Sequence, residues 1–138
     1  MHNFLTPVLG LIVWTFVMWV VMYVRRIPAM NKITKNTQDF IDNPALMDEI
    51  PPRVKWAADN YNHLHEQPVI FYALMFYLAA TGGADTLNMS LAWAYVVIRV
   101  LHSLVQITSN KVMIRFSLFV LGSLVLAAMT ARAVLALF

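Results

Sequence analysis

Residues 87–110 of the chain read LNMSLAWAYVVIRVLHSLVQITSN, an apolar run with an arginine in its middle. At about 100° per residue in an α-helix, the polar side chains of this run fall on one stripe. The stripe consists of Tyr95, Arg99, His102, Ser103, Gln106 and Asn110. An ionised guanidinium at bilayer depth costs about 2.5 to more than 10 kcal/mol, so it faces a protein interior or a water-filled cavity. The run therefore predicts a membrane-spanning helix whose polar face belongs to a functional site.

The rest of the chain predicts three more membrane spans. The sequence is 60% hydrophobic and 12% charged, whereas an ordinary soluble domain is about 25% charged. Each apolar segment reaches or approaches the roughly 20 residues that cross a hydrocarbon core. The predicted spans are residues 4–25, 53–81, 87–109 and 112–137, with a polar loop over residues 27–52. We therefore expect an all-α integral membrane protein, a four-helix bundle that forms a single membrane domain over residues 1–138.

The positions of the basic residues predict the orientation of the chain. The first loop and its flanks contain Arg25, Arg26, Lys32, Lys35, Arg53 and Lys55. The loop over residues 81–88 contains no Lys or Arg, and Lys111 lies between the last two spans. Because cytoplasmic loops carry the excess of Lys and Arg, we expect both termini on the non-cytoplasmic side. No basic residue precedes the first span, which predicts a retained helix rather than a cleaved signal peptide.

Composition also excludes several kinds of chemistry. The chain contains no cysteine, so it has neither a disulfide nor a thiol nucleophile of its own. Its net charge of +3 is explained by membrane orientation, and no nucleic-acid partner is expected. A compact, cysteine-free membrane chain suggests a bacterial inner membrane. His63 and His65 would point about 200° apart on a helix, which argues against a metal site.

Proline residues predict where helices stop and start. Pro28, Pro44 and the pair Pro51–Pro52 are expected to end helices, with a short helical segment over residues 37–42. The second long helix should begin near Pro51–Pro52 and be kinked by Pro68. The third is expected to begin after Asn88.

The polar faces of the last three helices should converge in the cytoplasmic half of the membrane. Two interpretations are open. In the first, Glu66 and Arg99 form a buried ion pair that positions the helices, and His63 and His102 are satisfied by hydrogen bonds. In the second, arginines from three helices form a pocket for a polyanionic small molecule. These arginines are Arg25, Arg26, Arg99 and Arg115.

The order and spacing of these residues resemble the MAPEG family, the membrane-associated proteins of eicosanoid and glutathione metabolism. The resemblance rests on the Arg99-Val-Leu-His102 run, on Gln106 and on Ile114-Arg115-Phe-Ser in the last two helices. It also rests on Asn62-His63-Leu-His-Glu66-Gln-Pro68 in the second helix. Three positions depart from the family pattern. Gln106 replaces a tyrosine, His63 replaces an asparagine, and Ala58-Asp59 stand where many members have an arginine.

The resemblance implies a homotrimer with active sites between adjacent bundles and glutathione as co-substrate. Arg115 would be the catalytic residue that stabilises the glutathione thiolate. The resemblance assigns the binding of glutathione to Arg25, Arg26, Arg53, Asn62, His63, Glu66, Arg99, His102 and Gln106. An apolar substrate would enter from the bilayer between the first and last spans. The reaction would be conjugation to a lipophilic electrophile or reduction of a lipid hydroperoxide.

Two alternatives remain open at this point. The altered motifs at His63 and Gln106 also fit a non-catalytic member of the family: a scaffold, a lipid-binding protein or an accessory subunit of a larger membrane complex. A small multidrug exporter has a similar size and four helices. Such exporters place an essential carboxylate in the first helix, and residues 4–24 contain none.

Overall fold

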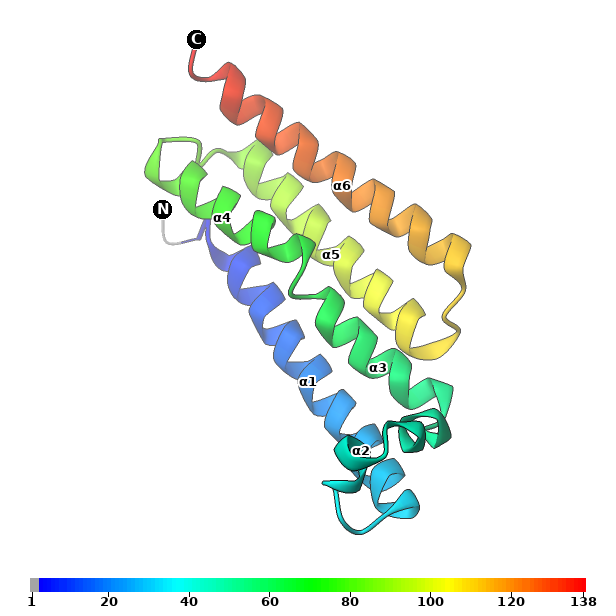
Figure 1. Ribbon diagram of the computed structural model, residues 1–138. Coiled ribbons are helices and arrows are strands. Elements are labelled where there is room, and N and C mark those ends of the chain that lie inside the picture. Colours follow the sequence, from blue (N-terminus) through cyan, green and yellow to red (C-terminus); the bar gives the residue numbers. More distant parts are fainter. Residues whose placement is uncertain (1–2) are drawn as a thin grey trace.

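The structure, a computed structural model, describes residues 3–138 and contains only helices within that range (Figure 1). The elements are α1 (Thr6–Ile33), α2 (Asp39–Asp42), the 3₁₀-helix η1 (Pro44–Glu49), α3 (Pro52–His63), α4 (Gln67–Ala80), α5 (Thr86–Thr108) and α6 (Val112–Leu135). Three of them, α1, α5 and α6, are long and apolar enough to cross a membrane. The expectation of an all-α chain with membrane-spanning helices is therefore confirmed.

The longest helix, α1, runs past Pro28 to Ile33, so the prediction that Pro28 ends a helix is wrong. A proline removes a single backbone hydrogen bond, and the turns on either side keep theirs. The helix ends instead at Ile33, because the backbone of the next residue, Thr34, is extended. The Thr34 hydroxyl donates to the Asp39 carboxylate at 2.5 Å and accepts the Asn36 N–H at 3.1 Å. These local bonds offer the chain an alternative to another helical turn. The short helical segment predicted within residues 37–42 is confirmed as α2.

The second predicted span is two helices rather than one kinked helix. The helix α3 begins at Pro52, as predicted, but ends at His63, and α4 begins at Gln67 with Pro68 in its first turn. In one continuous helix the Leu64 carbonyl would need the backbone N–H of residue 68, which proline lacks. In the first turn of a new helix, that N–H needs no partner within the helix. The chain therefore breaks over residues 64–66. Within this break the His63 backbone carbonyl accepts the Glu66 N–H at 3.3 Å, and the side chains on either side turn in different directions.

The elements place both ends of the described chain at one end of the molecule. Figure 1 shows the start of α1, the α4–α5 loop and the end of α6 together, with α2 and η1 at the opposite end. The helix α5 contacts α1, α3 and α6. The polar side chains of its stripe are buried from Tyr95 to Gln106, and Tyr95 stacks on Phe71 of α4 with ring centroids 4.7 Å apart. The central position of α5 is what brings Arg99 into the interior.

At the end that holds the α4–α5 loop, α5 begins at Thr86, earlier than predicted, because Asp85 caps it. The Asp85 carboxylate accepts the Asn88 backbone N–H at 2.7 Å. Its other oxygen accepts a hydrogen bond from the Arg132 guanidinium of α6 at 2.7 Å, and Arg132 also donates to the Asn88 side chain at 3.0 Å. These contacts fasten the start of α5 to the end of α6.

We predict that this cap makes stability depend on pH. The pKa of Asp85 lies below its ordinary 3.8, mainly because the carboxylate accepts the Asn88 N–H and further because it pairs with Arg132. A lowered pKa contributes stability that is complete above the unfolded-state pKa and is lost as the pH falls through the folded-state pKa. Asp85→Ala should cost about 0.5–2 kcal/mol, typical of a lost N-cap. Thermal unfolding in detergent measures both effects. Asp48→Ala, in the exposed η1 segment, is the control and should change neither the stability nor its acid limb.

Candidate functional site

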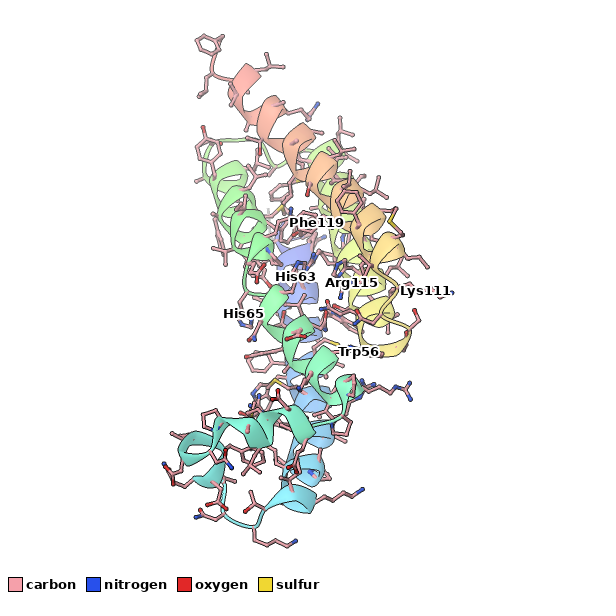
Figure 2. The ribbon with its side chains drawn as sticks, turned by 45° about the vertical axis from the view of Figure 1, so that its right-hand side comes forward. Trp56, His63, His65, Lys111, Arg115 and Phe119 are labelled. Carbon is pink, nitrogen blue, oxygen red and sulfur yellow. The ribbon has the colours of Figure 1, made fainter. Side chains whose placement is uncertain are left out.

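Between α3, α5 and α6 lies a cavity of about 180 Å³ that contains several of the predicted site residues. Its lining consists of His63, His102, Gln106, Val112, Arg115, Phe116 and Phe119. Figure 2 shows His63 and Arg115 between α3 and α6, while His65 lies on the other side of α3. The predicted opposite directions of His63 and His65 are confirmed. Among residues 3–138, no group of three or more His, Asp or Glu side chains is placed to hold a metal ion.

Arg99 lies behind this cavity and is only 1% exposed. One of its terminal nitrogens donates to His63 Nδ1 at 2.8 Å and approaches the His63 carbonyl oxygen at 3.4 Å. The Nε and the second terminal nitrogen are buried and have no hydrogen-bond partner among the described residues. Because His63 Nδ1 accepts this bond, the imidazole is neutral and carries its proton on Nε2.

The first of the two interpretations, a buried ion pair between Glu66 and Arg99, is wrong. The Glu66 side chain is 68% exposed, and its carboxylate lies 4.0 Å from His63 Nε2. The break after His63 explains this outcome, because Glu66 no longer continues the helical face that His63 occupies. The guanidinium therefore binds a neutral imidazole and a carbonyl oxygen, and neither cancels its charge.

The two histidines of the cavity stack on each other. Their ring centroids are 4.9 Å apart and their planes differ by 9°. The ring of Phe119 lies 5.7 Å from that of His63. His102 is 4% exposed, and its Nδ1 has no partner in the part of the chain that the structure describes. The prediction that hydrogen bonds satisfy both histidines therefore holds for His63 Nδ1 alone.

Arg115 lies in the first turn of α6 and reaches the same cavity. It donates to the side chain of Asn110, a residue whose φ of 50° closes the α5–α6 turn. Asn tolerates this left-handed conformation better than most residues. The Arg115 Nε and the Gln106 Oε1 are buried without a partner among the described residues. The Arg115 guanidinium thus lines the cavity, and the Arg99 guanidinium lies behind it. Among the described residues, no carboxylate is part of the lining.

Four other predicted binding residues lie outside this cavity. Arg25 donates to the Ile107 carbonyl oxygen at 2.8 Å and to the Arg53 carbonyl oxygen at 3.3 Å, so it fastens α1 to the end of α5. The side chain of Arg53 is exposed. Arg26 and Asn62 line another cavity, next to η1. Asn62 and His63 are neighbours in sequence, but about 100° on a helix separates their directions.

The structure adds residues that the sequence reading missed. Gln67 donates to the Ser123 hydroxyl at 2.7 Å and accepts from the Tyr95 hydroxyl at 3.2 Å. It thereby fixes the start of α4 against α5 and α6, beside the cavity. Phe116 and Phe119 supply an apolar wall. The sequence could have predicted this wall, because Phe119 lies one helical turn after Arg115 and therefore on the same face of the helix.

The comparison with protein families identifies the same family as the resemblance inferred from the sequence motifs. A model of the MAPEG family matches residues 4–135 of the 138-residue chain. The chain belongs to the MAPEG family. Comparisons with curated proteins and with solved structures found no match. MAPEG membership and the apolar helices together establish a membrane protein of the family of eicosanoid and glutathione metabolism.

Proposed function

We propose that this MAPEG protein binds glutathione in the His63–Arg115 cavity and uses its thiolate as a nucleophile. The acceptor would be a lipophilic electrophile, to which glutathione is conjugated, or a lipid hydroperoxide, which is reduced. The observation that carries the proposal is the buried guanidinium of Arg99. It has two unpartnered nitrogens and no carboxylate partner within residues 3–138.

An anion from outside the chain would resolve this electrostatic imbalance. Unpaired buried charges are costly, and arginine and carboxylate form charge-assisted hydrogen bonds that are about twice as strong as neutral ones. Arg115 Nε and Gln106 Oε1 lack partners at the same cavity. Glutathione offers two carboxylates, an ammonium group and peptide groups, which fit a site with both free donors and a free acceptor.

Each side chain has a proposed role that follows from its position. Arg115, at the cavity, would favour the thiolate over the thiol, because a neighbouring cation lowers a thiol pKa. Arg99 and His102 would bind carboxylate, and Gln106 would accept a peptide N–H. His63 would hold Arg99 in place through Nδ1. Glu66, at the exposed edge near His63, would bind the ammonium group.

The co-substrate must supply the sulfur, since the chain contains no cysteine. The thiolate is the reactive form of a thiol. The apolar wall of Phe116 and Phe119 lies beside Arg115, where it would contact the apolar part of the second substrate. The exposed outer face of α6, which includes Val120 and Leu124, would border the path from the bilayer.

We further propose that the site is completed in a homotrimer of four-helix bundles. The cavity volume of about 180 Å³ is below the roughly 300–1,000 Å³ of typical ligand pockets. A neighbouring copy would supply the missing wall. Only in such an assembly could Arg26, Arg53 or Asn62 of one copy reach glutathione bound to another, and these roles stay predictions. A bacterial inner membrane with both termini on the non-cytoplasmic side is part of the same proposal.

A non-catalytic, lipid-binding role is the second candidate. The observation that favours it is Gln106, whose amide stands where the family's tyrosine hydroxyl is expected. An amide cannot supply a phenolic proton or stabilise a thiolate as a phenol does. In this case the cavity would bind an anion without turning it over.

Thermal unfolding of the purified protein in detergent distinguishes these candidates. We expect two ligands to raise the unfolding temperature: glutathione, and the analogue of glutathione in which a methyl group replaces the thiol. Only glutathione should produce a thiolate absorption band, and a model electrophile should consume it. Binding of both ligands without a thiolate band or turnover would support the second candidate. No stabilisation by either ligand would remove the proposal.

A further inference from the structure

A second cavity lies between α1, η1 and α3, and it is larger than the one at Arg115. Its volume is about 340 Å³. Arg26, Lys55, Asp59 and Asn62 form its polar rim, and Ile50 and Val54 contribute an apolar floor. Neither Arg26 nor Lys55 forms an ion pair within residues 3–138. The two cations outnumber the single carboxylate, so the cavity has a net positive charge.

A row of exposed aromatic side chains on α1 leads to this cavity. Phe16, Trp19 and Tyr23 stack edge to face, with ring centroids 6.4 and 5.1 Å apart. They are 63%, 42% and 41% exposed. Arg26 follows Tyr23 at the next i+3 position, so all four residues share one face of the helix. An apolar track thus ends in a cationic group.

The far end of this track also meets a cavity. Phe16 lines a space of about 210 Å³ together with Tyr61 of α3, His65 of the break after α3 and Tyr72 of α4. His65 lies on the side of α3 away from Arg115 (Figure 2). The track thus has a cavity at each end, and we call the track and these two cavities together the α1–α3 groove. None of their lining residues lines the His63–Arg115 cavity.

We propose that this groove binds one phospholipid with an anionic headgroup. The phosphate lies between Arg26 and Lys55, and one acyl chain follows Phe16, Trp19 and Tyr23. Guanidinium and ammonium groups bind phosphate. Basic residues at the cytoplasmic surface attract anionic lipids, and aromatic side chains prefer the membrane interface. Asp59 and Asn62 accept hydrogen bonds from hydroxyl groups, which favours a glycerol headgroup.

This inference goes beyond the proposed function, because the groove shares no residue with the His63–Arg115 cavity. It gives Arg26 and Asn62 a role that needs no glutathione. It also applies to the full chain whether or not the protein catalyses a reaction. Failure of glutathione binding would leave it standing, and its own failure would leave the glutathione proposal standing.

The test measures lipid binding at Trp19. A full-length variant with Trp14→Phe, Trp56→Phe and Trp93→Phe keeps Trp19 as its one tryptophan. In nanodiscs of phosphatidylcholine, we add phosphatidylglycerol with brominated acyl chains, or brominated phosphatidylcholine, and record quenching of Trp19 fluorescence. We expect quenching at a lower mole fraction of phosphatidylglycerol. If the variant does not fold, native mass spectrometry of the unaltered chain counts bound phosphatidylglycerol instead.

The charge pair is tested by the double substitution Arg26→Ala with Lys55→Ala. A basic residue near an anionic surface contributes about fivefold in affinity, so losing both should weaken the preference about 25-fold. Lys32→Ala with Lys35→Ala is the matched control. It removes two exposed cations at the end of α1 that do not line the cavity, and it should keep most of the preference.

Several results would overturn the proposal. Equal quenching by both brominated lipids would show no headgroup recognition. An equal loss in the Lys32–Lys35 control would mean that general surface charge attracts the lipid. Displacement by the same concentration of glycerol phosphate would identify a site for soluble phosphate esters. A changed oligomer size in the Arg26–Lys55 variant, without a change in lipid preference, would show that a second copy of the chain covers the groove.

Discussion

Replacing Arg99 by methionine should greatly weaken glutathione binding and leave the ligand-free protein at least as stable as the unaltered one. Removing one partner of a buried charge pair costs about 2–5 kcal/mol, so the affinity should fall by about 30-fold to several thousand-fold. The ligand-free chain already holds Arg99 with two nitrogens unpartnered. Removing a buried charge that has no carboxylate partner therefore relieves a desolvation penalty.

Weaker glutathione binding without a loss of ligand-free stability is the result expected of a binding residue, whereas a structural residue would lose stability. Titration calorimetry measures the affinity, and thermal unfolding without ligand measures the stability. Lys35→Met is the control, because its ammonium group is exposed and lies outside the cavity. It should change neither quantity. If Arg99→Met lowers the ligand-free stability by several kcal/mol and keeps the affinity for glutathione, Arg99 is a structural residue and the proposed site is wrong.

Replacing Arg115 by alanine should remove the thiolate while leaving most of the affinity for the tripeptide. Arg115 lines the cavity directly, and losing one preorganised donor to a developing negative charge typically costs 10²–10³-fold in rate. The ultraviolet band of bound thiolate and the rate with a model electrophile measure this loss. The pH at which the band reaches half its height should rise, because no cation then favours the charged form.

The conservative variant makes this test specific. Arg115→Lys keeps a positive charge at the cavity and should restore part of the thiolate band, although a lysine cannot reproduce the bond to Asn110 in the same geometry. Arg132→Ala removes a guanidinium at the other end of α6 and should not move the band. A thiolate band of full height in Arg115→Ala would assign its stabilisation to another group.

The periodicity of a single helix was sufficient to predict which face of α5 is buried. The structure buries Tyr95, Arg99 and Gln106 of the predicted stripe. It exposes Val97 and Leu101 on the opposite face. Spacing determines this result because polar groups avoid lipid on every turn of a membrane helix. The same reasoning predicted that the stripe would meet α3 and α6.

The sequence was less informative about partners within the site. Glu66 and His63 were both within reach of Arg99, and charge alone favoured Glu66. The break before Gln67 decides between them, since it turns Glu66 to solvent and leaves His63 facing Arg99. A proline predicts that a helix is disturbed, but not whether it is kinked, as expected at Pro68, or ended.

Adjacent basic residues posed a related difficulty. Arg25 and Arg26 were both assigned to glutathione through the resemblance to the MAPEG family. In the structure, Arg25 binds the end of α5 and Arg26 lines a different cavity. A difference of about 100° between neighbouring side chains separates these environments. In the proposed trimer, which of them faces a neighbouring copy would depend on the contacts between copies, and no local sequence pattern encodes that geometry.

The most direct test of the account is a calorimetric titration of the purified protein with glutathione, followed at the same time by the thiolate absorption band. The account predicts saturable binding with a thiolate band in the unaltered protein. It further predicts much weaker binding in Arg99→Met and loss of the band alone in Arg115→Ala. Unchanged affinity in Arg99→Met together with an unchanged band in Arg115→Ala, or no binding by the unaltered protein, would contradict the claim that these two guanidinium groups form an anion site.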